Sequence, residues 1–184
     1  MRAVVPLLAL ASVAHAESKK DRELAAKAIC KAAAPAAGTK PAPLINLYNE
    51  HTHEWLAVDP AAPLPAGELD LFLRDHYTNK STTMEPKLLG VLVAAARNFK
   101  SDVVDVVSGF RHPKYNLMLR KKGHQVARDS QHTHGNAVDF FIPHVTTQQL
   151  QAWAKAQKLG GVGLYLESGF VHMDTGPIRY WSGD

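Results

Sequence analysis

Two short segments carry the residue types that a catalytic metal site uses. Residues 130–139 read Ser-Gln-His-Thr-His-Gly-Asn-Ala-Val-Asp, and a second histidine segment, 172–174, begins 33 residues after Asp139. His132, Asp139 and His172 supply two imidazoles and a carboxylate, all of which bind zinc, and three protein ligands leave a fourth position open. An open position is where a water molecule can be activated. The pattern therefore predicts a hydrolytic metal centre.

A strand explains why Asp139 sits among apolar neighbours. Residues 137–142 are apolar, aromatic or β-branched apart from Asp139, which is typical of a buried strand. Side chains alternate between the two faces of a strand, so Asp139 shares its face with Ala137 and Phe141. An unpaired buried carboxylate is costly, and Asp139 therefore needs a metal ion or a hydrogen-bonded cation beside it.

A second strand brings the other imidazole to the same place. Residues 169–174 also read as a strand, and His172 and Asp174 project from one face of it. Gly135 follows His132 closely, and a bend there can carry the imidazole back over the carboxylate. For any single histidine of the 10, an ordinary polar role is the better interpretation, but the three residues together favour a shared metal site.

The residues around the ligands form motifs that resemble a known family. Ser130-x-His132-x-x-Gly135-x-Ala137-x-Asp139 resembles the zinc signature of metallopeptidases of the D-Ala-D-Ala carboxypeptidase and dipeptidase type. One branch, the MepK-like murein endopeptidases, formerly a domain of unknown function, is similar over residues 44–181. The similar segments are 47–54, 73–76, 108–116, 160–165, 170–177 and 179–181.

The resemblance implies roles for individual residues. His132, Asp139 and His172 would be the ligands of one zinc ion per chain, and Arg111 would hold the substrate carbonyl or its oxyanion. A physical reason supports Arg111 separately, because residues 103–107 read as a strand that leaves Arg111 near its tip. A planar, permanently charged group suits a carboxylate or an oxyanion. A surface salt bridge is the alternative role.

Two acids compete for the role of general base. A zinc-bound water needs a nearby carboxylate to take its proton and deliver it to the leaving amine. Asp174 shares a face with His172 and is the first candidate, although it can instead orient a ligand imidazole. Glu167 is the rival, because related zinc folds place a base shortly before the last histidine. Leu166 stands where the family usually has proline, which weakens the case for Glu167.

Other histidines receive no metal role. His134 departs from the family pattern and is interpreted as an exposed residue. Alternation along a strand explains the spacing of His51 and His53. The histidines in polar or loop-like surroundings are His112, His124 and His144.

Targeting features occupy the beginning of the chain. Residues 1–16 combine Arg2, a short apolar run and the small-x-small site Ala14-His15-Ala16, which predicts a signal peptide. The protein is then expected in the periplasm or secreted, with a retained anchor as the alternative, and the resemblance implies association with the bacterial cell wall. Residues 17–43 read as a helix and an Ala/Pro-rich tether, and residues 44–184 as the zinc peptidase domain.

Charge and hydropathy disfavour two kinds of partner. The formal net charge is +4, and removal of the signal, with one basic residue and no acid, leaves +3. This mild charge suits an anionic cell-wall polymer and shows no clustered footprint for nucleic acid. After the signal, no apolar run approaches about 20 residues, so no stable membrane span is expected. The oligomeric state stays open.

Periodicity places the domain in the α+β class. Apolar spacing predicts helices packed on a small antiparallel sheet with a single zinc site. The resemblance implies the hedgehog/D-Ala-D-Ala peptidase-like version of that fold. Thr146 or Thr147 is expected to cap the last helix. Beyond the segments above, strands are predicted at 44–48 and 55–58, and helices at 66–77, 86–99, 115–122 and 146–158.

We therefore expect a secreted zinc-dependent peptidase that hydrolyses stem-peptide cross-links of peptidoglycan. A D-Ala-D-Ala carboxypeptidase or dipeptidase shares the chemistry and differs only in the shape of its cleft. A non-catalytic, zinc-stabilised module that binds the cell wall is the alternative from another class, and dispersed histidines disfavour a zinc scavenger. Tyr165, Tyr180 and Trp181 are candidates for a cleft lining, or for the core.

Overall fold

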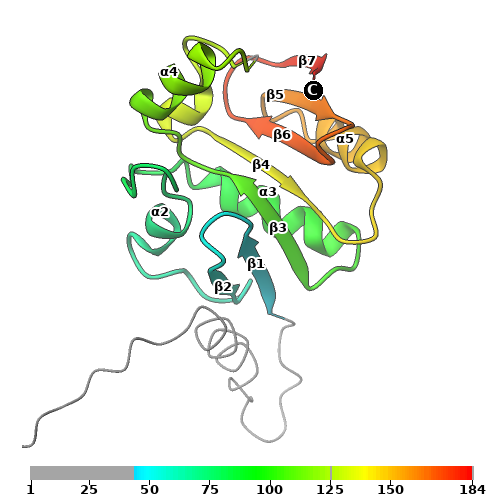
Figure 1. Ribbon diagram of the computed structural model, residues 1–184. Helices are drawn as coiled ribbons and strands as arrows, with labels where there is room; N and C mark the ends of the chain where they lie inside the picture. The colour runs from blue at the N-terminus through cyan, green and yellow to red at the C-terminus, as the bar shows by residue number, and fades with distance from the viewer. Residues whose placement is uncertain (1–43, 125, 184) are drawn as a thin grey trace, which may run out of the picture.

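One mixed sheet organises the protein, whose computed structural model describes residues 44–124 and 126–183 (Figure 1). Its seven strands lie in the order β2-β1-β3-β4-β6-β5-β7. Residues 1–16 and 17–43, predicted to be a signal peptide and a tether, lie outside the described residues. Within the described part, no helix has the length and apolar character needed to cross a membrane.

The strands are short, and the five predicted from the sequence are confirmed. β4 runs antiparallel to both of its neighbours, β3 and β6, so the strand that carries Asp139 has partners on both sides. The bounds are β1 Ile45–Asn49, β2 Trp55–Val58, β3 Val103–Ser108, β4 Ala137–Phe141, β5 Gly161–Tyr165, β6 Phe170–Asp174 and β7 Arg179–Ser182.

The expectation of a small antiparallel sheet was wrong, although the α+β class is confirmed. β1 pairs in parallel with β3, and β5 pairs in parallel with β7. Parallel strands need a crossover connection, and the segment from β2 through the second helix supplies it between β1 and β3. Local periodicity carries no information about such long connections, which is why the sequence did not reveal the mixed sheet.

Four α-helices and one 3₁₀ helix occur among the described residues. The helix predicted at 66–77 is much shorter, because the Asp75 carboxylate accepts the Thr78 amide and hydroxyl and stabilises a turn instead. Thr146 caps the last helix in a reciprocal capping box with Gln149, as predicted. The bounds are α2 Glu68–Phe72, α3 Lys87–Asn98, α4 Pro113–Lys121, η1 Gln131–His134 and α5 Thr147–Ala156.

The core lies on one face of the sheet. In Figure 1, α3 and α5 lie behind the strands, and Leu88 and Leu92 of α3 are fully buried. Val138 and Phe140 of β4 belong to the same buried cluster. Because neighbouring residues of a strand face opposite sides, Asp139 between them points to the other face. That other face carries the site.

Asp105 is an acid that the sheet disfavours in its ionised form. It lies on β3 with 8% exposure, and burial, together with the charge of Glu50, raises the pKa of its carboxyl to about 6. The unfolded chain ionises near the ordinary value of 3.8, so between these values a rise in pH favours the unfolded state. We expect Asp105→Asn to raise the free energy of unfolding by about 2–3 kcal/mol near neutral pH and by little in acid below that ordinary value.

Urea unfolding in the two pH ranges measures this difference. Asp102→Asn, at an exposed position just before the same strand, is the matched control and should change stability equally in both. An effect of Asp105→Asn that does not depend on pH would contradict the expectation.

Candidate metal centre

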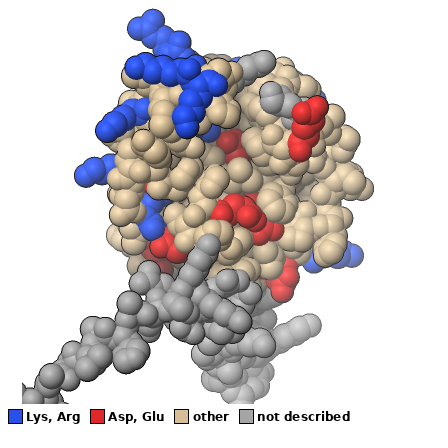
Figure 2. Space-filling model, in the orientation of Figure 1, with Lys and Arg blue, Asp and Glu red and all other residues tan. Residues whose placement is uncertain are grey.

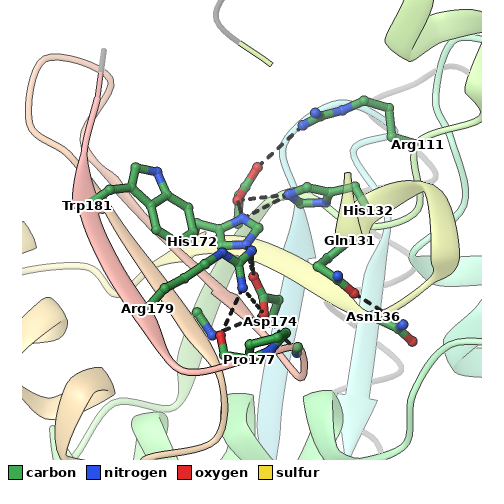
Figure 3. A network of polar contacts seen from close by, with 12 residues as sticks. Arg111, Gln131, His132, Asn136, His172, Asp174, Pro177, Arg179 and Trp181 are labelled. Carbon is green, nitrogen blue, oxygen red and sulfur yellow. Dashed lines mark hydrogen bonds and ion pairs between the residues drawn. The ribbon is translucent and has the colours of Figure 1, made fainter. Parts of the chain in front are cut away.

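The register of the sheet brings two predicted ligands together. Asp139 on β4 lies directly opposite His172 on β6, so their side chains are neighbours on one face. His132 reaches them from η1, immediately before β4. All three residues are buried, and their ligand atoms lie within 4.8 Å of one another. Figure 3 shows the rings of His132 and His172 turned toward each other.

Gly135 makes the return of His132 possible. Its φ is 74°, a left-handed conformation that glycine adopts without strain. A side chain also has no room, because a Cβ would lie 2.5 Å from the backbone oxygen of Thr83. The predicted bend is confirmed.

Three acceptor atoms converge on one point. His132 Nε2 lies 3.1 Å from Asp139 Oδ1 and 3.0 Å from His172 Nδ1, and the last two atoms are 2.8 Å apart. Ligand atoms of a tetrahedral metal with bonds of about 2.0–2.1 Å lie about 3.3 Å apart, so these separations are close to those of a metal site.

The other ring nitrogens fix the tautomers. His132 Nδ1 lies 2.7 Å from the Gly109 carbonyl, and His172 Nε2 lies 2.9 Å from Asp174 Oδ2, so each nitrogen donates its proton there. The neutral rings then direct their remaining lone pairs at each other and at Asp139. This arrangement is unfavourable unless a cation lies between them, and two imidazoles with a carboxylate fit a divalent transition metal.

Electrostatics in the site prepare Asp139 and His132 for metal binding, whereas at His172 they favour the protonated ring. Burial opposes ionisation of Asp139, but the adjacent imidazoles hold its pKa well below its usual range. Burial lowers the pKa of His132, which keeps a lone pair available on Nε2. Burial acts in the same direction on His172, yet the carboxylates of Asp139 and Asp174 raise its pKa. A metal binds an ionised carboxylate and neutral imidazoles, so a metal at His172 Nδ1 has to displace the proton that the raised pKa favours.

Asp174 lies behind His172, on the edge of the ring away from the other ligands. Its Oδ2 accepts from His172 Nε2 and, at 2.6 Å, from Arg179 Nη2. Its Oδ1 accepts from the amides of Gly161 and Gly176 and from Arg179 Nη1. Burial opposes its ionisation, but these donors hold the pKa of Asp174 well below its usual range. The contacts fix the orientation and tautomer of His172.

Arg179 is a site residue whose role the sequence did not reveal. The sequence marked 179–181 only through the family resemblance, and Arg179 meets Asp174 across the turn between β6 and β7 (Figure 3). The single local signal is a cation five residues after an acid. Its guanidinium also lies 5.0 Å over the ring of Trp181.

Arg111 lies on the other side of Asp139 and retains free donors. Its Nη2 is 3.6 Å from Asp139 Oδ2 and 3.5 Å from the Ser108 hydroxyl, both long contacts. Among the described residues, no acceptor pairs with the buried Nε of Arg111. The Arg111 amide donates to the His132 carbonyl at 3.0 Å, which ties the arginine to the loop of the metal site. The guanidinium therefore has capacity for a ligand oxygen.

A cleft of about 750 Å³ opens over the three ligands. Tyr165, Phe170 and Trp181 line one wall, and the indole of Trp181 lies 5.1 Å from the ring of His172. Trp181 Nε1 donates to the Tyr165 hydroxyl at 3.1 Å. Gly163 pairs with Trp181 across β5 and β7 and makes room for the indole, because a Cβ there would lie 2.6 Å from it.

A stack of rings contributes to the lining elsewhere. The rings of His51 and His76 stack with centroids 4.0 Å apart, and Tyr115 meets His76 edge-on at 5.0 Å. The expectation of a strand at His51 was wrong, because it lies in the turn between β1 and β2. The Asn49 side chain accepts the amides of His51 and Thr52 and so holds this turn.

Three other residues considered in the sequence analysis, Glu167, His134 and Tyr180, lie away from the three predicted ligands. Glu167 is exposed in the turn between β5 and β6 and is not among the residues that line the cleft. His134 is exposed, as predicted, and lies 2.6 Å from Asp129. Tyr180 is 47% exposed and does not line the cleft; Lys155 lies 5.3 Å over its ring.

Comparison with known proteins gives a consistent set of matches. A family model described as peptidoglycan L,D-endopeptidase MepK matches residues 39–181. A probable peptidoglycan L,D-endopeptidase MepK of Haemophilus influenzae is 35% identical over 141 residues, which is 76% of each chain. The peptidoglycan L,D-endopeptidase MepK of Escherichia coli strain K12 is 36% identical over 115 residues, 62% of this chain and 63% of that protein. No solved structure matches the chain.

Proposed function

Because the chain belongs to the family of the peptidoglycan L,D-endopeptidase MepK, we propose that it hydrolyses an L,D peptide bond in the stem-peptide cross-links of peptidoglycan. The observation that carries the proposal is the convergence of three ligand atoms beneath a cleft that also presents Arg111. The cleft volume of about 750 Å³ lies in the range of small-ligand and peptide sites.

Zinc is the metal that we assign to the site. Its ligands in this proposal are His132 Nε2, Asp139 Oδ1 and His172 Nδ1. Two imidazoles and one carboxylate form a known type of catalytic zinc site, with a position left for water or substrate. When bound, zinc polarises a peptide carbonyl and lowers the pKa of a water ligand to about 7.

The residues around the proposed ligands bind the substrate and orient the ligands. Arg111, whose Nη2 makes only long contacts with Asp139 and Ser108, holds the oxygen of the scissile carbonyl and the negative charge that this oxygen gains in the transition state. The Gly109 carbonyl keeps His132 in the ligating tautomer. The aromatic wall of Tyr165, Phe170 and Trp181 packs against the peptide and shields the site from bulk solvent.

Asp174 acts in this proposal as a positioning residue. Both of its oxygens already accept hydrogen bonds, and the carboxylate lies behind His172 rather than on the open side of the site. Glu167 then becomes the acid to test for proton transfer, because the next residue, Ser168, lines the cleft.

The substitution Asp174→Asn distinguishes a positioning residue for His172 from a general base. We expect the affinity for zinc to fall about 10- to 100-fold, because an amide cannot accept all of these hydrogen bonds and His172 loses its fixed orientation. Activity should largely return at saturating zinc. Zinc titration and rates at high zinc measure both quantities. Unchanged zinc affinity with a lost rate would instead make Asp174 the base, and Glu167→Gln is the matched acid-to-amide variant.

Digestion of purified sacculi by the zinc-loaded full chain tests the function, with the released fragments identified by mass. Loss of cross-linked dimers and gain of monomers, abolished by a chelator, is the expected result. Trimming of terminal D-Ala alone would indicate a carboxypeptidase. Tightly bound zinc without any product would favour a zinc-stabilised module that binds the cell wall.

The same proposal places the protein in the periplasm or at the cell wall. The substrate named for the relatives, peptidoglycan, lies there. Residues 1–16 would direct export, and residues 17–43 would tether a peptidase domain formed by residues 44–184.

A further inference from the structure

Basic side chains gather beside the cleft on α4 and the segment after it. The described residues contain 14 Lys and Arg and 13 Asp and Glu. Five of these cations and none of the acids fall within residues 112–128, so this segment carries +5 and the other described residues together carry −4. Figure 2 shows blue side chains at the upper left, where Figure 1 places α4. The α4 surface consists of Lys114, Arg120, Lys121, Lys122 and Arg128.

The five cations are exposed and have no acidic partner. All lie at the protein surface, and none forms an ion pair with another residue in the described ranges. Asp129, the acid that follows Arg128, pairs with His134 instead. Like charges at neighbouring positions repel each other, so this grouping disfavours the free protein and favours a state with bound anions.

The stability of α4 alone does not explain why the five cations lie where they do. Arg120 and Lys121 lie in the last turn of α4, where cations interact well with the helix dipole. Lys114, however, lies in the first turn, where a cation is unfavourable, and Arg128 lies beyond the helix. A shared ligand explains all of these positions together.

The α4 surface continues directly into the cleft. Tyr115, Leu119 and His124, from the same segment, line the cleft over the metal centre. A polymer whose peptide enters the cleft therefore passes next to the cations. The surface is outside the site itself, because none of its five residues lines the cleft.

We propose that the α4 surface binds free carboxylates of the peptidoglycan network around the peptide that occupies the cleft. The identity of this polymer rests on the proposed function. Each exposed charge contributes little by itself, but several charges that engage one insoluble polymer act together. The surface would hold the enzyme on its substrate while the cleft selects the bond.

Co-sedimentation of the full chain with purified sacculi tests the surface, with a chelator present so that no digestion occurs. The test variant is K114Q/R120Q/K121Q/K122Q. The control K87Q/R97Q/K100Q/K158Q removes the same number of exposed cations elsewhere. At low salt, the test variant should bind at least about tenfold more weakly than the control, and added salt should weaken wild-type binding.

A second measurement separates binding from catalysis. With zinc bound, the test variant should cleave a soluble cross-linked muropeptide dimer with a kcat/KM within about twofold of wild type. Equal sacculus binding by test and control variants would overturn the inference and leave the proposed function intact. Preference of the wild type for phosphatidylglycerol vesicles over sacculi, or loss of soluble turnover in the test variant, would also overturn it. Binding through this surface without any digestion would refute the proposed function alone.

Discussion

Replacement of Asp139 by alanine is expected to remove bound zinc and to slow cross-link hydrolysis by about three orders of magnitude or more. Asp139 is the anionic member of the proposed ligand set, and its Oδ1 lies 3.1 Å from His132 Nε2 and 2.8 Å from His172 Nδ1. Without it, two imidazole lone pairs face each other with no charge to hold a cation. Metal polarisation of a carbonyl contributes several kcal/mol, and about 1.4 kcal/mol corresponds to tenfold in rate.

Two measurements test this expectation: the zinc content per chain after gel filtration, and the rate of hydrolysis of soluble cross-linked dimers. His132→Ala should behave in the same way. Asp129→Ala is a matched control, because Asp129 is a carboxylate that lines the same cleft but is not one of the three proposed ligands. One zinc per chain in both ligand variants would show that the assignment of the metal centre is incorrect.

Substitution of Arg111 by lysine is expected to lower kcat about 100- to 1,000-fold while one zinc per chain is retained. The guanidinium makes only long contacts with Asp139 and Ser108, so most of its donors remain for the substrate oxygen. Lysine keeps the charge but cannot present two donors in a plane. The effect should fall on kcat more than on KM, because the charge on the oxygen develops in the transition state.

Steady-state kinetics with zinc-loaded protein separate the two parameters. Arg97→Lys, at an exposed position on α3, is the matched control. A rise in KM alone would place Arg111 in recognition of a substrate carboxylate. Loss of zinc would show that the arginine mainly supports Asp139, from which it lies 3.6 Å away.

Local spacing predicts the parts of the site that depend on strand geometry. The period of two along β6 places His172 and Asp174 on one face, and Asp139 is isolated in an apolar strand. Gly135 marks the bend that returns His132. These relations need only neighbouring residues, so one sequence contains them. The assignment of the three residues as zinc ligands stays a prediction until metal is measured.

Other parts depend on contacts between distant segments. The position of Asp174 behind a ligand of the proposed site depends on the Gly161 amide, 13 residues earlier on β5, as well as on Gly176 and Arg179 in the segment that follows β6. The parallel pairing of β1 with β3 depends on a long crossover. α2 ends early because the Asp75 carboxylate accepts hydrogen bonds from Thr78 and stabilises a turn. In the sequence, the apolar spacing over this segment favours a longer helix, so the turn was not predicted.

The absence of a side chain at Gly163 has a consequence for how substrate range can evolve. The indole of Trp181 occupies the place where a Cβ would lie, and the same indole flanks His172 at the cleft wall. One nucleotide change turns a glycine codon into an alanine codon, and the added methyl would clash with the indole and displace it. A single substitution, Gly163→Ala, would therefore change the shape of this cleft wall. The choice of substrate can therefore change through this wall while the three proposed metal ligands and the charged groups stay the same.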